Sequence, residues 1–173
     1  KMDKVNVQRK LDGFRVQIHK DGDLVRIFSR NLEETTAMFP EIVAAAKKQI
    51  KAKSVILDGE AIGFNPISGE FLPFQETTQR RRKYGIDEMS KKIPLKAFCF
   101  DILYKNGKPL IDEALGTRLQ ALEETINDGE TLFPEIGETV DDPKKLQVML
   151  DESISEGLEG LVVKRLDSKY EAG

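Results

Sequence analysis

A lysine, a carboxylate, a glycine and an arginine lie within six residues near the start of the chain, in the segment KLDGFR at positions 10–15. A lysine is a nucleophile only as the neutral amine, and at its reference pKa of about 10.4 only about four amines in ten thousand are neutral at pH 7. Neighbouring cations or partial desolvation lower that pKa, and Arg15 or a bound metal ion is the kind of neighbour required. Lys10 is therefore a candidate nucleophile, although an Asp-Gly pair is also common in charged surface turns.

Three later segments place charged groups inside or beside apolar strands: LDGEA at 57–61, AFCFDILY at 97–104 and EGLVVK at 159–164. Strand interiors disfavour Asp and Gly, so Glu60 either is solvated at a bulge or faces a bound ligand. The aromatic rings of the second segment either fill a core or stack on a planar base. Glu159 and Lys164 are compatible with a plain surface ion pair. Each segment alone leaves both interpretations open.

The elements that must position these groups follow from the hydrophobic pattern. Alternation predicts strands at 5–9, 14–18 and 24–28, with the second and third joined as a hairpin by an Asp-Gly turn. Further strands are predicted at 55–64, 95–104 and 161–163, and helices at 117–126, from Asp142 onward, and after Thr36, which we expect to cap a helix containing Pro40. Strands in separated hairpins with helices placed irregularly between them predict an α+β fold with antiparallel sheets flanked by helices.

Composition excludes several classes of protein and of catalytic site. The chain has 173 residues, 39% of them hydrophobic, which is enough for a core without disulfides. Cys99 and His19 are the only residues of their types, which excludes an intramolecular disulfide, a thiolate metal cage and Ser-His-Asp catalysis, and favours an intracellular location. A net charge of −3 argues against a dedicated nucleic-acid-binding domain but not against a local basic patch. No apolar stretch is long enough to predict a membrane span.

The order of the charged segments is more specific than any one of them. Lys-x-Asp-Gly-x-Arg, then Asp-Gly-Glu, then Phe-Asp, then Glu-Gly-Leu-Val-Val-Lys resembles the nucleotidyltransferase motifs of ATP-dependent DNA ligases. The segments SRN at 29–31 and PFQ at 73–75 are also similar to that family. The resemblance implies a covalent nucleotidyltransferase (ATP-grasp-like) fold. It also implies that residues 1–173 are an adenylation domain truncated at both ends, without the last lysine motif and the OB-fold domain, and of low activity alone.

This resemblance implies an enzyme that seals nicks in double-stranded DNA during replication, repair and recombination. Lys10 would attack the α-phosphate of ATP and carry AMP, which then passes to the 5′-phosphate of the nick with the help of Mg²⁺. The implied contacts are the following: Gln8, where the family more often has Glu, to adenine; Phe100 stacked on adenine; Arg15 and Glu60 to the ribose; Glu60 and Glu159 to Mg²⁺; Lys164 to a phosphate; and Arg30 to the nucleotide and the nick phosphate.

Alternatives to a DNA ligase remain open from the sequence. An RNA ligase or an mRNA capping guanylyltransferase shares the lysine nucleophile, and a non-catalytic nucleotide- or nucleic-acid-binding remnant would explain the absent lysine motif. The basic run Arg80, Arg81, Arg82 and Lys83 is either a solvated charge run or a contact to DNA phosphates. We expect at least one of these arginines to bind DNA.

Overall fold

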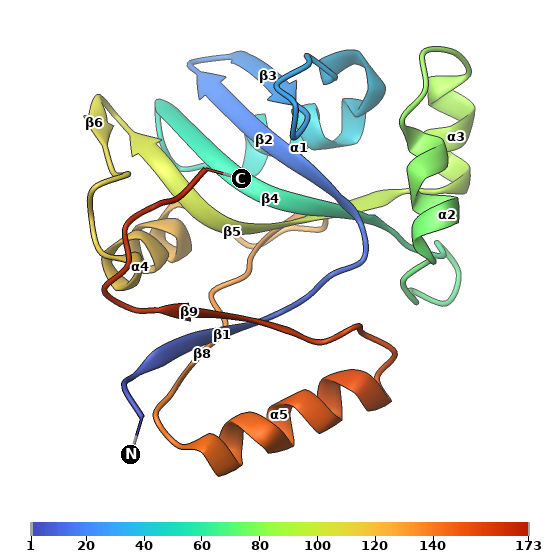
Figure 1. The fold of residues 1–173 in the computed structure, drawn as a ribbon. Coiled ribbons are helices and arrows are strands. Elements are labelled where there is room, and N and C mark those ends of the chain that lie inside the picture. The colour runs from blue at the N-terminus through green and yellow to red at the C-terminus, as the bar shows by residue number, and fades with distance from the viewer. Residues whose placement is uncertain (1, 173) are drawn as a thin grey trace.

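The computed structural model describes residues 2–172, which form two sheets, one mainly and one wholly antiparallel, and the helices that cover them (Figure 1). The strands are β1 (Val5–Arg9), β2 (Phe14–Asp21), β3 (Leu24–Phe28), β4 (Ser54–Gly63), β5 (Leu95–Lys105), β6 (Lys108–Pro109), β7 (Leu132–Pro134), β8 (Glu138–Val140) and β9 (Leu161–Arg165). The α-helices are α1 (Pro40–Gln49), α2 (Phe74–Thr77), α3 (Ile86–Lys92), α4 (Leu115–Thr125) and α5 (Pro143–Ser155), with 3₁₀ helices η1 (Thr36–Met38) and η2 (Thr78–Arg80).

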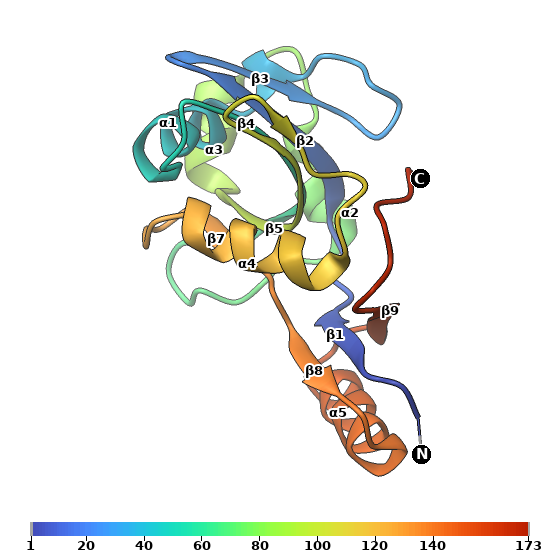
Figure 2. The same cartoon turned by 90° about the vertical axis from the view of Figure 1, so that its left-hand side faces the viewer.

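The larger sheet has the order β3-β2-β4-β5-β6, and β7 pairs with β5 in parallel. Helices α1 and α4 cover one face of it, as Figure 2 shows. Side chains such as Ile42 of α1 and Leu122 of α4 pack there with Ile18, Leu57 and Ile102 of the strands, and all five are fully buried. Because successive strand residues point to opposite faces, the intervening polar residues of β2 and β4 lie on the other face, away from this core.

The smaller sheet has the order β8-β1-β9, with both pairs antiparallel. Val5, Val7 and Val140 pack with Leu146 and Met149 of α5 and form a second, smaller core. Asn6 and Gln8, which alternate with the two valines of β1, therefore face away from α5. In Figure 1 this sheet and α5 lie below the larger sheet, and the chain crosses from one sheet to the other between β1 and β2.

Most of the predicted elements are confirmed, including the β2–β3 hairpin and the α+β class with antiparallel sheets. The capping role of Thr36 is wrong. Its Oγ1 accepts a hydrogen bond from the Ile27 N–H at 2.9 Å, and α1 begins four residues later at Pro40 without a side-chain cap. Strands β7 and β8 were not predicted, because three residues are too few to show alternation. Within residues 2–172, no helix has the length and apolar character that crossing a bilayer requires.

Candidate active site

The turn between β1 and β2 presents Lys10. Gly13 passes so close to β4 that a Cβ atom there would lie 1.9 Å from the carbonyl oxygen of Ala61, so this turn needs glycine. The Lys10 N–H donates to the carbonyl of Gly160 at 3.3 Å, and the Lys10 Nζ lies 3.8 Å from Glu159 Oε2. The two side chains are 57% and 65% exposed. The structure thus brings together two predicted site residues 149 positions apart, and leaves the amine accessible.

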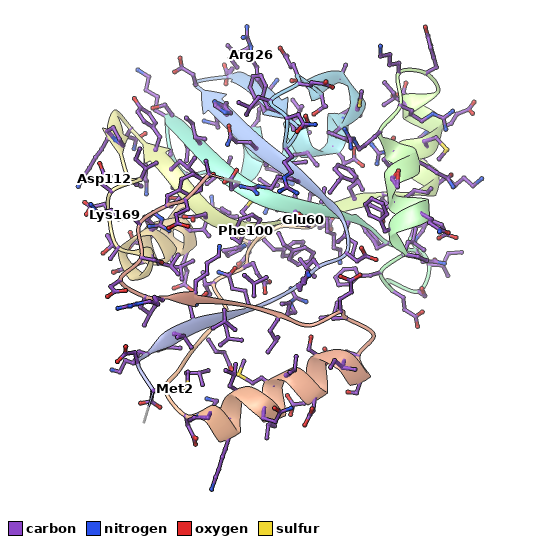
Figure 3. All side chains as sticks on the ribbon, in the orientation of Figure 1. Met2, Arg26, Glu60, Phe100, Asp112 and Lys169 are labelled. Carbon is purple, nitrogen blue, oxygen red and sulfur yellow. The ribbon has the colours of Figure 1, made fainter. Side chains whose placement is uncertain are left out.

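An open cavity of about 290 Å³ lies between the two sheets, beside Lys10. Figure 3 labels Glu60 and Phe100 where the polar face of the larger sheet is turned toward the smaller one. Six of the residues predicted to bind nucleotide line this cavity, and five further residues complete it. The predicted set is Gln8, Lys10, Arg15, Glu60, Phe100 and Lys164; the others are Arg9, Leu11, Phe98, Glu135 and Val162.

Glu60 comes from β4, just after a shift in its register with β5 between Asp58 and Gly59. The predicted bulge is therefore present, but the carboxylate faces the cavity rather than open solvent. Burial raises the pKa of Glu60 to about 7, against the opposing effects of the Gly13 N–H and the Arg15 guanidinium. A carboxyl group with this pKa changes between its neutral and charged forms near pH 7. A ligand that donates hydrogen bonds to it favours the charged form.

Phe100 is partly exposed, so its ring is not a plain core residue. The Arg15 guanidinium carbon lies 5.2 Å from the ring centroid and the Lys164 Nζ 5.1 Å from it. Burial lowers the pKa of Lys164, which is also placed near the guanidinium of Arg118. An accessible ring flanked by cations can stack on a planar base that carries phosphates.

Gln8 is 4% exposed, and its Nε2 has no hydrogen-bond partner among the described residues. An unsatisfied buried amide costs about 1–3 kcal/mol. The group lines the cavity, where a ligand with polar edges would satisfy it. This position agrees with the expected contact between Gln8 and a base.

Two groups of site residues were missed by sequence reasoning. Arg9 and Glu135 form an ion pair, with Nη2–Oε1 at 2.6 Å and Nε–Oε2 at 3.2 Å, and the Arg9 guanidinium lies 5.0 Å from the Phe98 ring centroid. Asp58 and Tyr170 form the second group, joined at 2.6 Å. Glu135 and Tyr170 lie outside the charged motifs, so nothing in the sequence pairs them with partners more than 110 positions away.

Arg30 lies outside the cavity beside Lys10. It is exposed and lines an adjoining cavity of about 130 Å³, which also contains Arg15, Asp58 and Tyr170. Its charge opposes the rise in the pKa of Glu60, which places it in the electrostatic field of the site. The structure therefore places Arg30 next to the cavity beside Lys10 rather than in its wall.

The expectation that Arg80 contacts DNA is wrong, because its side chain is buried. It is 1% exposed and pairs with Glu41 of α1, with Nη2–Oε1 at 2.7 Å and a second contact from Nη1. It also donates to the carbonyls of Ile93 at 2.9 Å and Met38 at 3.1 Å. Its neighbours in sequence, Arg81 and Arg82, are exposed. Arg80 therefore links η2 to α1, and the exposed part of the basic run begins at Arg81.

Comparison with known proteins agrees with this geometry. The family described as ATP dependent DNA ligase domain matches residues 1–173. The chain is 51% identical over 173 residues to a probable DNA ligase of Dictyoglomus turgidum, covering 100% of this chain and 30% of that protein. It is 38% identical over 169 residues to a DNA ligase of Nanoarchaeum equitans, covering 96% of this chain and 30% of that protein.

Solved structures share the fold. A mycobacterial DNA ligase D complexed with ATP and MES matches with a TM-score of 0.70 and 26% identity, over 98% of this chain and 51% of that one. The ATP-dependent DNA ligase of bacteriophage T7, in complex with ATP, matches with a TM-score of 0.68 and 18% identity, over 98% and 59%. The chain spans about a third of the length of the curated relatives it matches. A family match over its full length and these relatives show that the chain belongs to the ATP-dependent DNA ligase domain family.

Proposed function

We propose that the chain is the adenylation domain of a DNA ligase and that Lys10 is the residue that becomes adenylylated. The observation that supports this most is the arrangement around the cavity. An accessible lysine, a partly exposed aromatic ring, a half-buried carboxylate, a guanidinium and an unsatisfied amide surround one space of about 290 Å³. Each of these groups can bind or react with one part of ATP. The relatives are named DNA ligases.

The reaction we assign to Lys10 is a transfer of AMP. The neutral Nζ attacks the α-phosphorus of ATP, a P–N bond forms, the P–O bond to pyrophosphate breaks, and the amine loses its proton to water. Arg15 and Glu60 bind the ribose hydroxyls, Phe100 stacks on adenine, and the Gln8 amide binds the edge of the base. Holding the nucleotide in this way converts the transfer into an intramolecular step. AMP then passes to the 5′-phosphate of a DNA nick, with Arg30 and Lys164 near the phosphates.

The carboxylates of the site fit Mg²⁺ only together with substrate phosphates. Within residues 2–172, no three or more Asp, Glu, His or Cys side chains are grouped closely enough to hold a metal ion by themselves. Mg²⁺ typically takes one or two carboxylates plus phosphate oxygens and waters, and Glu60 and Glu159 supply such a pair of hard ligands. When bound, the ion would neutralise charge on the phosphoryl oxygens.

We also propose that further segments complete the enzyme. The relatives are about three times as long as this chain, and the DNA-binding step requires a surface that surrounds the duplex. A lysine motif for the α-phosphate and an OB-fold domain are the segments we expect, with double-stranded DNA containing a nick as the partner. The functional tests below therefore use the protein that contains this chain together with those segments.

Covalent labelling with different nucleotides tests the proposed function. The protein is incubated with Mg²⁺ and with ATP, GTP or NAD⁺ labelled so that the transferred nucleotide carries the label. We expect label from ATP that is released by pyrophosphate. Label from GTP alone would identify a capping-type guanylyltransferase. Binding of ATP without any covalent label would identify a non-catalytic remnant.

ATP binding should strengthen as the pH rises through about 7. Burial raises the pKa of Glu60 to about 7, and the ribose hydroxyls donate to the charged form. Below that pH the carboxyl is protonated, so affinity should fall by up to about tenfold per pH unit. ATP titration between pH 5.5 and 8.5, with the metal chelated and Lys10 replaced by alanine to prevent transfer, measures this. The Glu60→Gln variant should lose the part of the dependence that Glu60 contributes and keep only the part that comes from the terminal phosphate of ATP. An unchanged pH profile in that variant would contradict this role.

The two exposed arginines of the basic run should contribute to DNA binding, whereas Arg80 should not. Arg81→Ala and Arg82→Ala should each reduce the slope of log K against log salt by about 0.9, because each removes one phosphate contact. Arg80→Ala should leave that slope unchanged but lower the free energy of unfolding by about 3 kcal/mol, since it leaves Glu41 and two carbonyls without their partner. Nicked-DNA binding across a salt series and denaturant unfolding separate the two effects. Unchanged slopes in both Arg81 and Arg82 variants would exclude this surface.

A further inference from the structure

We propose that Tyr170 is a positioning residue for Arg15, acting through the carboxylate of Asp58. This inference rests on the proposed function, because it concerns how the site holds the ribose of ATP. Tyr170 lies in the segment that follows β9, and Arg15 lies in β2, 155 positions earlier. The structure joins them through one buried group and through a longer direct hydrogen bond between the two side chains.

Asp58 is that buried group. It is fully buried in β4, and its Oδ2 accepts hydrogen bonds from the Tyr170 hydroxyl at 2.6 Å and from Arg15 Nη2 at 2.6 Å. Arg15 Nη2 also lies 3.4 Å from the Tyr170 hydroxyl oxygen. Gln17 Nε2 donates to the other oxygen of Asp58 at 3.2 Å. A buried carboxylate with three donors is held in one orientation, and it fixes the guanidinium that depends on it.

The hydroxyl of Tyr170 stays protonated and therefore donates a hydrogen bond. Burial raises the pKa of Tyr170 to about 12, and the hydrogen bond to Asp58 adds to that effect. The phenol is therefore neutral at physiological pH and supplies one hydrogen to the carboxylate without adding charge. Asp58 is therefore paired with one cation, Arg15, and accepts a second hydrogen bond from a neutral group.

The segment that carries Tyr170 is fixed to the larger sheet by contacts of its own. The Tyr170 N–H donates to the carbonyl of Ile111 at 3.0 Å. Arg118 Nη1 donates to the carbonyl of Ser168 at 2.9 Å, and Arg118 is itself paired with the buried Asp101. Because the backbone leading into Tyr170 is held at two points, losing only the hydroxyl should leave the segment in place.

The free side of Arg15 faces the nucleotide cavity. Its Nε is buried without a partner among the described residues, and its guanidinium lies 5.2 Å from the Phe100 ring on which the base would stack. Arg15 lines the cavity alongside Glu60, the other residue we assign to the ribose. When the Tyr170 hydroxyl is removed, Asp58 Oδ2 is left with Arg15 alone, and the guanidinium is drawn toward it and away from the ribose.

Tyr170→Phe tests this role with a readout that a merely structural residue would not change. The adenylation rate is measured with ATP and with 2′,3′-dideoxyATP, which keeps the base and phosphates but lacks both ribose hydroxyls. We expect the KM for ATP to rise about tenfold, since hydrogen bonds to charged groups contribute about that much, while kcat is preserved. The KM for dideoxyATP should not change. Tyr84→Phe is the matched control, because Tyr84 is 82% exposed.

The ratio of the two KM values is measured on one preparation, so it does not depend on the fraction of folded protein. The proposal is supported if, in Tyr170→Phe, the KM for dideoxyATP divided by the KM for ATP falls toward one. Equal losses with both nucleotides, or no change in the KM for ATP, would overturn it. An absence of label in the wild-type protein would instead refute the proposed function itself, so the two failures are distinguishable.

Discussion

Replacing Lys10 with alanine is expected to abolish covalent labelling with AMP, a loss of about a thousandfold or more, while leaving the fold intact. Lys10 supplies the amine that forms the P–N bond, so its removal takes away the nucleophile. The fold should survive because the Lys10 side chain is 57% exposed and its ion pair with Glu159 is 3.8 Å long. Exposed pairs of this kind contribute under about 1 kcal/mol. Labelling with α-labelled ATP and a thermal unfolding curve measure the two quantities.

Lys164→Ala is the matched control for that experiment. Lys164 also lines the cavity, and burial lowers its pKa, so it is the alternative amine by chemistry. Its position over the Phe100 ring, rather than beside the β1–β2 turn, predicts weaker nucleotide binding but surviving label at Lys10. Label that persists in Lys10→Ala and disappears in Lys164→Ala would reverse the assignment.

Replacing Asp101 with alanine should destabilise the protein by about 3–5 kcal/mol. Asp101 and Arg118 form a buried ion pair, with side chains 3% and 2% exposed and a closest contact of 2.8 Å. Arg118 also donates to the carbonyls of Glu113 at 2.6 Å and Ser168 at 2.9 Å. Removing the carboxylate leaves a buried guanidinium without a counter-charge, at a point where α4, β5 and the segment after β9 meet. Denaturant unfolding measures the change in the free energy of unfolding.

Asp167→Ala is the control for the ion-pair experiment, because Asp167 pairs with Arg165 at 2.9 Å on the surface, where both side chains are about two-thirds exposed. Solvent screens such a pair, so its loss should leave the unfolding midpoint nearly unchanged. Similar midpoints for Asp101→Ala and Asp167→Ala would show that the buried pair does not hold these elements together.

The parts of the site that sequence reasoning could predict are those where charge interrupts a strand. Glu60 is recognisable in the sequence because a carboxylate inside an apolar strand is unfavourable unless it faces water or a ligand. In the structure it lines the cavity. Lys10 and Glu159 stand out beside glycines at strand ends, and the structure places them 3.8 Å apart. Alternation of apolar residues with an Asp-Gly turn was enough to predict the β2–β3 hairpin, and apolar runs were enough to predict the long strands β4 and β5.

The parts that could not be predicted depend on which distant segments meet. The three consecutive arginines cannot be told apart from the sequence. In the structure, however, Arg80 is buried against Glu41, while Arg81 and Arg82 are exposed. A short 3₁₀ helix turns one side chain inward and its neighbours outward, and that turn leaves no periodic signal in three residues. Tyr170 meets Asp58 only because the segment after β9 returns to the larger sheet, which no local pattern encodes.

The most direct test of the account is the mass and position of the covalent adduct. The protein is incubated with ATP and Mg²⁺, its intact mass is measured, and the modified peptide is sequenced by fragmentation. We predict one AMP per chain, attached to Lys10, and its loss on adding pyrophosphate. An adduct on Lys164 or another lysine, or a protein that binds ATP in this cavity and gains no mass, would contradict it.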